Sequence, residues 1–179
     1  IRHHANQPFC LYVAHEAPHA PYQGPYDDPK GFRIVGRAQV SQNLTPEEIR
    51  QRYRDMVIEV DRGVGQIIRT LNELGLAGRT LVFFFSDNGA TPRGSNKPLR
   101  GHKGSLWEGG HRVPAIAWWP GHIAAGRTVD QLAAGFDLMP TMMELAGARV
   151  RQEHKLDGIS LVPALLRGEK LAPRKLFWG

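Results

Sequence analysis

Three short runs of apolar residues place the strongest constraint on what this chain can fold into. They cover residues 9–14, 80–86 and 113–119, and nearly every position in them is apolar. A strand with one solvated face alternates apolar and polar residues, whereas a strand covered on both faces is apolar throughout. The runs therefore predict three buried strands, in a sheet that is covered on both of its faces.

A long amphipathic helix is predicted between the first two runs, over residues 45–74. Thr45 is placed to cap its start, Pro46 suits the first helical position, and Glu48 completes a capping box. Gly75 suits its end, because glycine readily takes the left-handed conformation found there. Apolar residues recur between these ends at steps of three and four and form one stripe: Ile49, Tyr53, Met56, Val57, Val60, Val64, Ile67, Ile68, Leu71 and Leu74.

Two shorter helices are predicted over residues 138–146 and 161–166, followed by Gly147 and Gly168. The order strand, helix, strand, turn, strand, helix is typical of an α/β sheet. With 41% apolar and 22% charged residues, the composition excludes a disordered tail, a fibrous repeat and a disulfide scaffold. The single cysteine, Cys10, lies in the first apolar run, where we expect it to be buried as a small hydrophobic residue.

Charge and hydropathy narrow the choice of partners. The chain has 23 Lys and Arg against 17 Asp and Glu, a formal net charge of +6. The basic residues are spread along the chain and no RNA- or DNA-binding signature occurs, so we expect no nucleic acid partner. No apolar run approaches the roughly 20 residues that cross a bilayer, so we expect no membrane span.

Titratable and amide side chains collect directly after the first two predicted strands. His15 and His19 follow the first strand, and Asp87 and Asn88 follow the second. In an open parallel sheet, ligands bind beyond the carboxyl ends of the strands. Either segment alone is also consistent with a plain turn or a surface histidine. Their shared position at strand ends favours a functional site.

Residues 15–19 also match the H-E-x-x-H pattern of zinc peptidases. That chemistry needs a helix, which puts both histidines on one face. Pro18 would disrupt a helix at this point, and the segment follows a predicted strand. We therefore interpret the match as accidental.

Asp87 and Asn88 offer a carboxylate and an amide oxygen side by side. Both are hard oxygen ligands, which suit calcium or magnesium rather than zinc. Calcium takes about 6 to 8 oxygen ligands, so two residues cannot complete its site. If this is a metal site, the remaining ligands lie outside these 179 residues.

A glycine-rich segment, residues 96–112, carries several cationic side chains, among them Lys97, Arg100, His102 and Lys103. Glycine lets the backbone approach a ligand closely, and cationic donors suit an anionic group such as sulfate or phosphate. The segment is not a phosphate-binding P-loop, because the G-x-x-x-x-G-K-[ST] spacing is absent.

Together these motifs resemble the type I sulfatases, a family of formylglycine-dependent sulfuric ester hydrolases. The resemblance is carried by residues 8–21, by Phe85-Ser-Asp-Asn-Gly89 and by Pro98-Leu-Arg-Gly-His-Lys-Gly-Ser-Leu-Trp-Glu-Gly-Gly-His-Arg-Val-Pro114. Residues 137–147 and 156–161 continue it in the order found in the family. The resemblance implies an α/β, alkaline-phosphatase-like fold, with a mostly parallel sheet flanked by helices, incomplete at both ends of this chain.

The resemblance also implies roles for individual residues. Asp87 and Asn88 would be ligands of one Ca²⁺, or sometimes Mg²⁺. Lys103 would contact the sulfate, and His19 would hydrogen-bond the sulfate or the bridging oxygen and protonate the leaving alcohol. We further expect substrate contacts from five residues: His15, Asn96, Lys97, Arg100 and His102. The substrate would be a sulfated small molecule or glycan, with a sulfated sugar as our expectation.

The family's nucleophile is absent from the sequence. It is a formylglycine made from Cys or Ser in a Cys/Ser-x-Pro-x-Arg motif, and Cys10 is followed by Leu-Tyr-Val-Ala instead. We expect the formylglycine upstream of Ile1 and a small C-terminal subdomain beginning near residue 176. Residues 1–179 would then be a fragment of a single catalytic domain, inactive alone. Two alternatives stay open: a phosphodiesterase or phosphonate monoester hydrolase of the same fold, and a non-catalytic binder of sulfated glycans.

Overall fold

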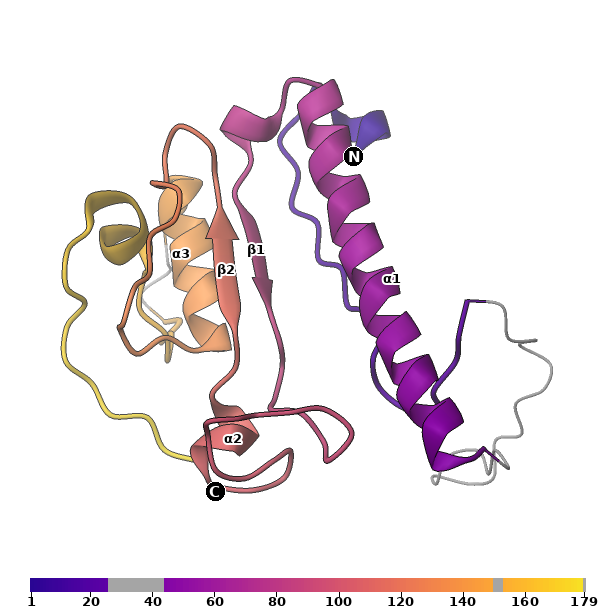
Figure 1. Cartoon of the computed structure of the whole chain (residues 1–179). Coiled ribbons are helices and arrows are strands. Elements are labelled where there is room, and N and C mark those ends of the chain that lie inside the picture. The colour runs from indigo at the N-terminus through magenta and orange to yellow at the C-terminus, as the bar shows by residue number, and fades with distance from the viewer. Residues whose placement is uncertain (26–43, 150–152, 179) are drawn as a thin grey trace. The chain divides into compact units, whose positions relative to one another are not determined.

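The computed structural model describes residues 1–25, 44–149 and 153–178 (Figure 1). The chain divides into two compact units, residues 1–77 and 78–179, which we describe one at a time. In the described part of the chain, no helix combines the length and the apolar character needed to cross a membrane.

Helix α1, Pro46–Glu73, is the main element of the first unit and confirms the long helix predicted from the sequence (Figure 1). Its capping box is formed: the Thr45 N–H donates to the Glu48 carboxylate at 2.7 Å, and the Glu48 N–H donates to the Thr45 hydroxyl at 3.3 Å. The chain then leaves the helix through Gly75, whose φ of 65° is left-handed. The helix therefore begins and ends where the sequence predicts.

The apolar stripe of α1 is narrower than predicted. Met56 and Leu71 are buried, with 7% and 1% of their surface exposed. Val57, which we placed in the stripe, is 44% exposed. Adjacent positions on a helix point about 100° apart, so Met56 and Val57 cannot both face the same neighbouring segment.

The first predicted strand is wrong in this structure. Residues 9–14 do not form a strand, and Leu11, Tyr12 and Val13 are 54%, 84% and 46% exposed. Cys10, which we expected to be buried, is exposed as well. A strand exists only when its backbone pairs with a neighbour, and none of the described residues pairs with this segment. Apolar composition alone does not supply that partner.

The second unit holds two strands, β1, Val82–Phe85, and β2, Ala115–Trp118, which lie within the other two predicted strands (Figure 1). They pair antiparallel, with Val82 opposite Trp118 and Phe85 opposite Ala115. The α/β class is confirmed, but this pair departs from the parallel arrangement we expected. Two parallel strands need a crossover connection of about a dozen residues or more, which is usually an α-helix. Here the connection contains only the four-residue helix α2, Glu108–His111.

Helix α3, Leu138–Leu145, confirms the second predicted helix and follows a 3-10 turn, Gly135–Asp137. The third predicted helix is a single π-helical turn, Pro163–Arg167, and the chain leaves it through Gly168 with a φ of 71°. Short 3-10 turns at Arg2–His4 and Ala77–Arg79 complete the regular structure of the described residues.

A buried carboxylate, that of Asp137, links three segments of the second unit. Asp137 is 0% exposed, and its side chain accepts hydrogen bonds from the Ala134 N–H at 2.7 Å and the Ile159 N–H at 3.0 Å. It also pairs with Arg174, whose Nη1 lies 2.7 Å from Oδ1. Burial by itself would raise the pKa of Asp137, but the hydrogen bonds from Arg174, Ile159 and Ala134 outweigh it and lower that pKa. The pair ties the C-terminal segment to the start of α3.

Thr141 extends this buried polar group into the next segment. It is 1% exposed, and its hydroxyl donates to the Asp137 carbonyl at 2.6 Å. The same hydroxyl accepts from the Leu161 N–H at 2.8 Å. The two segments that continue the family resemblance, residues 137–147 and 156–161, are thus joined by hydrogen bonds from one to the other.

Candidate functional site

The histidine segment that follows the first apolar run forms a turn, not a helix. The His19 N–H donates to the Glu16 carbonyl at 2.8 Å, and no residue from 15 to 19 is helical. The two histidines therefore cannot lie on one helical face as a zinc peptidase requires. The structure thus confirms that the segment is not helical, as Pro18 predicted.

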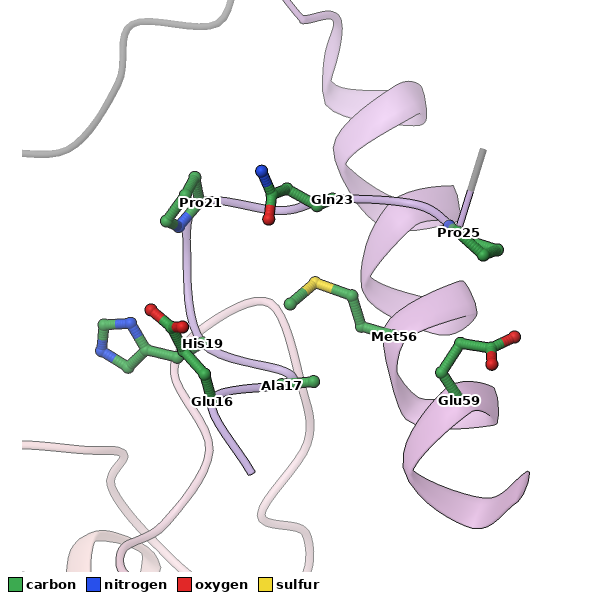
Figure 2. Close-up of a pocket in the computed structure, with 8 residues that line it drawn as sticks. All are labelled: Glu16, Ala17, His19, Pro21, Gln23, Pro25, Met56 and Glu59. Atoms are coloured by element: carbon green, nitrogen blue, oxygen red, sulfur yellow. The ribbon is translucent and has the colours of Figure 1, made fainter. Parts of the chain in front are cut away.

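An open pocket of about 200 Å³ lies between this turn and α1. Figure 2 shows Glu16 and His19 on the turn and Met56 and Glu59 on the helix; Ala17, Pro21, Gln23 and Pro25 complete the lining. The Nδ1 atom of His19 lies 2.7 Å from the Ala20 carbonyl oxygen. A carbonyl only accepts, so Nδ1 carries a hydrogen and the neutral ring has its lone pair on Nε2.

His15 is placed differently and does not line this pocket. Its Nε2 lies 3.4 Å from where a Cβ on Gly63 would stand, so the ring packs against the backbone of α1. A larger residue at position 63 would press on the imidazole. Of these two histidines, His19 lines this pocket and His15 does not.

In the second unit, Asp87 and Asn88 form a tight turn directly after β1. The Asp87 Oδ1 atom accepts from the Asn88 N–H at 3.0 Å, and the Ser86 hydroxyl donates to the Asn88 carbonyl at 2.9 Å. The Asn88 amide nitrogen donates to the Gly89 carbonyl at 3.2 Å. The Asn88 amide is thereby oriented with its nitrogen on the backbone, which leaves its oxygen as the side-chain atom that can accept a cation or a hydrogen bond.

This turn packs directly on the backbone of α2. The Gly89 N–H donates to the Gly110 carbonyl at 2.9 Å. A Cβ at Gly89 would stand 1.8 Å from the Gly109 carbonyl oxygen, closer than any side chain allows. Position 89 is therefore a place of close backbone contact that only glycine fits, while Gly109 and Gly110 are kept free of side chains by the carbonyls of Gly101 and Ser105.

The Lys103 loop, the part of the glycine-rich segment 96–112 that carries Lys103, is attached to the same turn. The Lys103 N–H donates to the Ala90 carbonyl at 3.0 Å, and the Gly109 N–H donates to the Arg100 carbonyl at 2.7 Å. Lys103 is half-buried, and no ion pair with a described residue neutralises its ammonium group. A lysine held beside a carboxylate–amide turn can supply positive charge to an anionic group.

The other predicted substrate contacts divide into two kinds. Lys97 and His102 are exposed, and the His102 Nδ1 atom lies 2.8 Å from the Lys103 carbonyl oxygen. Arg100 stacks on Trp107, with its guanidinium carbon 3.7 Å from the ring centroid. Asn96 instead turns its amide onto the loop backbone. Its oxygen accepts from the Ala90 N–H at 2.7 Å, which the sequence does not reveal.

Asp87 and Asn88 fit a hard divalent cation as part of its donor set. They supply one carboxylate and one amide oxygen, the ligand types that Ca²⁺ and Mg²⁺ prefer. No cluster of three or more His, Cys, Asp or Glu side chains that could hold a metal occurs in the described ranges. A complete site therefore needs further oxygen ligands beyond this pair.

Sequence reasoning missed three features of the second unit. Arg174 carries no motif, yet it pairs with Asp137 across 37 positions of the chain. The hydrogen bonds of the Asn96 amide to Ala90 and Gly101 were also missed, because sequence spacing does not give the direction of a side chain. The close backbone packing at Gly109 and Gly110 was the third feature missed. Here the sequence does carry a usable signal, because two adjacent glycines stand close to another glycine-rich turn.

Comparison with known proteins places the chain among sulfatases. The sequence profile of the family described as Sulfatase matches residues 1–148. The chain is 42% identical to N-acetylgalactosamine-6-sulfatase of Sus scrofa over 179 residues, which cover 97% of this chain and 31% of that protein. It is 39% identical to arylsulfatase A of Bos taurus over 180 residues, 98% of this chain and 32% of that protein.

A solved structure agrees with these sequence matches. The crystal structure of Ps i-CgsB in complex with k-i-k-neocarrahexaose superposes with a TM-score of 0.79 at 36% sequence identity, covering 94% of this chain and 36% of that chain. The chain thus spans about a third of the length of the relatives it matches.

Proposed function

Because this chain belongs to the sulfatase family, we propose that the protein containing it is a sulfuric ester hydrolase acting on a sulfated sugar. The observation that carries the proposal is the family match over residues 1–148, which includes the Asp87-Asn88 turn and the Lys103 loop. These two segments are hydrogen-bonded to each other through the Ala90 carbonyl. The family match and the local geometry therefore concern the same residues.

The substrate class is inferred from charge and from relatives. Sulfate esters are anionic, and this chain carries a formal net charge of +6. One relative is named for the 6-sulfate of N-acetylgalactosamine, and a solved relative holds a neocarrahexaose. A sulfated sugar is the substrate class common to these names.

Each residue of the proposed site has a distinct task. Asp87 and Asn88 would contribute oxygen ligands to Ca²⁺, or to Mg²⁺. The cation, when bound, would supply positive charge that stabilises the transferring sulfuryl group. Lys103 would contact a sulfate oxygen and offset charge that develops there.

His19 would act as the proton donor to the leaving alcohol. The Ala20 carbonyl keeps one ring hydrogen on Nδ1, so the transferable proton is held on Nε2 of the protonated ring. The family implies a formylglycine nucleophile, which this sequence would not supply because it has no Cys/Ser-x-Pro-x-Arg motif.

The test is hydrolysis by the protein containing this chain, with an aryl sulfate, an aryl phosphate and an aryl phosphonate as parallel substrates. We expect turnover of the sulfate to exceed turnover of the other two. Preferred hydrolysis of the phosphate or the phosphonate would favour a phosphoryl-transfer enzyme of the same fold. Binding of a sulfated glycan without turnover would favour a non-catalytic binder.

Lys103→Ala tests the site within the same assay. Loss of one charge-stabilising donor should lower kcat/KM by about 10²- to 10³-fold. Lys155→Ala is the matched control, since Lys155 is an exposed lysine of the same unit and has no proposed role. Equal activity of the two variants would remove Lys103 from the site.

A further inference from the structure

Asn96 uses its whole side-chain amide to join two loops. Its Oδ1 atom accepts from the Ala90 N–H at 2.7 Å. Its Nδ2 atom donates to the Ala90 carbonyl at 3.0 Å and to the Gly101 carbonyl at 3.1 Å. Both amide hydrogens and one oxygen lone pair are therefore engaged by the backbone, which leaves no hydrogen for a substrate.

The two backbone positions to which Asn96 is hydrogen-bonded lie close in sequence to the proposed site residues. Ala90 lies two positions after Asn88, and Gly101 lies two positions before Lys103. The Ala90 carbonyl also accepts from the Lys103 N–H at 3.0 Å. One carbonyl oxygen is thus shared by the Asn96 amide and the Lys103 backbone.

We propose that Asn96 is a positioning residue, which fixes the position of the proposed metal-ligand turn relative to the proposed sulfate-binding loop. The inference rests on the proposed function and replaces the substrate contact that the sequence suggested for Asn96. Only an amide of this length can accept from one N–H while donating to two carbonyls. Aspartate keeps the acceptor but loses both donors, and alanine loses all three hydrogen bonds.

Positioning matters here because the two loops carry different parts of the charge stabilisation. A cation ligand and a lysine act on the same sulfate only when their separation is held within a fraction of an ångström. Substitution of a residue that orients a metal ligand lowers metal affinity or activity by about 10- to 100-fold. The same range is expected for Asn96.

The experiment compares Asn96→Ala with Ser95→Ala in the protein containing this chain. Ser95 is the matched control, because its hydroxyl accepts only the local Lys97 N–H at 3.3 Å and joins no two loops. Three properties are measured: hydrogen exchange of the Ala90 and Lys103 amides without metal, the Kd for Ca²⁺ without substrate, and kcat and KM for an aryl sulfate.

For Asn96→Ala we expect faster exchange at both amides, while exchange in the core of α3 is unchanged. The Kd for Ca²⁺ should rise and kcat should fall, each by about 10- to 100-fold, with a much smaller change in KM. Ser95→Ala should resemble the unaltered protein in all three measurements. Unchanged amide exchange and an unchanged Kd in Asn96→Ala would overturn the inference, and so would a loss of protection throughout the second unit.

Asn96→Asp adds a readout that a purely structural role would not move. Its ionised carboxylate would face the Ala90 and Gly101 carbonyls and repel them, whereas the protonated form can donate one hydrogen bond. The kcat of this variant relative to the unaltered protein should therefore rise as the pH is lowered. A flat ratio would count against the positioning role.

If the unaltered protein hydrolyses none of the sulfate esters tested, the proposed function is wrong. Amide exchange and Ca²⁺ binding still decide the role of Asn96 in that case, because neither requires turnover. If the unaltered protein is active and Asn96→Ala equals it in amide exchange and Kd, the proposed function stands and the positioning role is wrong.

Discussion

At the scale of single residues, Asp137 and Arg174 form a buried ion pair that links two distant parts of the chain. Both side chains are removed from water, with 0% and 14% of their surface exposed. Removing one partner of such a pair leaves an uncompensated buried charge. We expect Asp137→Asn to lower the free energy of unfolding by about 3–5 kcal/mol at neutral pH, measured by urea titration.

The control is Asp130→Asn, an exposed aspartate of the same unit, which should change the free energy of unfolding by less than about 0.5 kcal/mol. If the two variants are equally stable, the Asp137–Arg174 pair contributes nothing measurable to the fold.

The same pair predicts how stability depends on pH. The pKa of Asp137 is lower in the folded protein than its ordinary value, so on acidification the unfolded chain takes up this proton first. The contribution of the pair is fully present above the ordinary carboxyl pKa of about 3.9 and is lost as the pH falls through the lowered folded-state value. Urea titrations at decreasing pH should show a steeper loss of stability for the unaltered protein than for Asp137→Asn. Parallel curves would contradict this.

Gly109 sets a steric limit at the residue scale. A methyl group there would stand 2.5 Å from the Gly101 carbonyl oxygen and 2.7 Å from the Arg100 carbonyl oxygen, and neither backbone atom can rotate away. Although alanine favours helices, we expect Gly109→Ala to destabilise the protein by about 1–3 kcal/mol in thermal or urea unfolding. Gly78→Ala is the control, because the nearest atom to its Cβ is 4.0 Å away. Equal stability of both variants would show that α2 can shift away from the Arg100–Gly101 backbone.

At the scale of elements, α1 depends on a few deeply buried side chains rather than on its whole apolar stripe. Leu71 is 1% exposed and Val57 is 44% exposed, although both belong to the predicted stripe. Leu71→Ala should therefore lower the free energy of unfolding by about 2–5 kcal/mol in a denaturant titration. Val57→Ala should cost well under about 1 kcal/mol. A Leu71→Ala loss no larger than that of Val57→Ala would mean that the buried face of α1 is misplaced.

At the scale of the whole molecule, these 179 residues alone should hydrolyse no sulfate ester. The sequence has no Cys/Ser-x-Pro-x-Arg motif, and the chain spans about a third of its relatives. The check is aryl sulfate hydrolysis by the purified chain in excess Ca²⁺. Turnover above that of a Lys103→Ala preparation would refute the expectation.

The activity proposed for the protein containing this chain should depend on a divalent metal. Asp87 and Asn88 would supply two of the about 6 to 8 oxygen ligands of a calcium ion, and a chelator that competes for the ion tests whether activity needs it. We expect chelation to abolish aryl sulfate hydrolysis and added Ca²⁺ or Mg²⁺ to restore it. Asp87→Asn should need a higher concentration of the metal for half-maximal recovery. Full activity after exhaustive chelation would exclude the proposed metal site.

Local signals in the sequence were sufficient for several parts of this protein. The capping box at Thr45 and Glu48 and the glycines at 75, 147 and 168 located the helix ends, because capping depends on residues within one turn of each other. Apolar periodicity located α1, Gly147 marked the end of α3, and motif order predicted the sulfatase family. The roles of Asp87, Asn88, Lys103 and His19 also came from that resemblance, and they stay predictions.

Pairing and side-chain direction were decided only by the tertiary structure. Continuous apolar runs did not reveal that β1 and β2 pair antiparallel, or that residues 9–14 lack a strand partner among the described residues. Nor did spacing reveal that Arg174 reaches Asp137, or that the Asn96 amide turns onto Ala90 and Gly101. The physical reason is range: a cap or a stripe is set by neighbours in the chain, whereas a strand partner, a buried ion pair and a loop-holding amide depend on segments that only folding brings within hydrogen-bond distance.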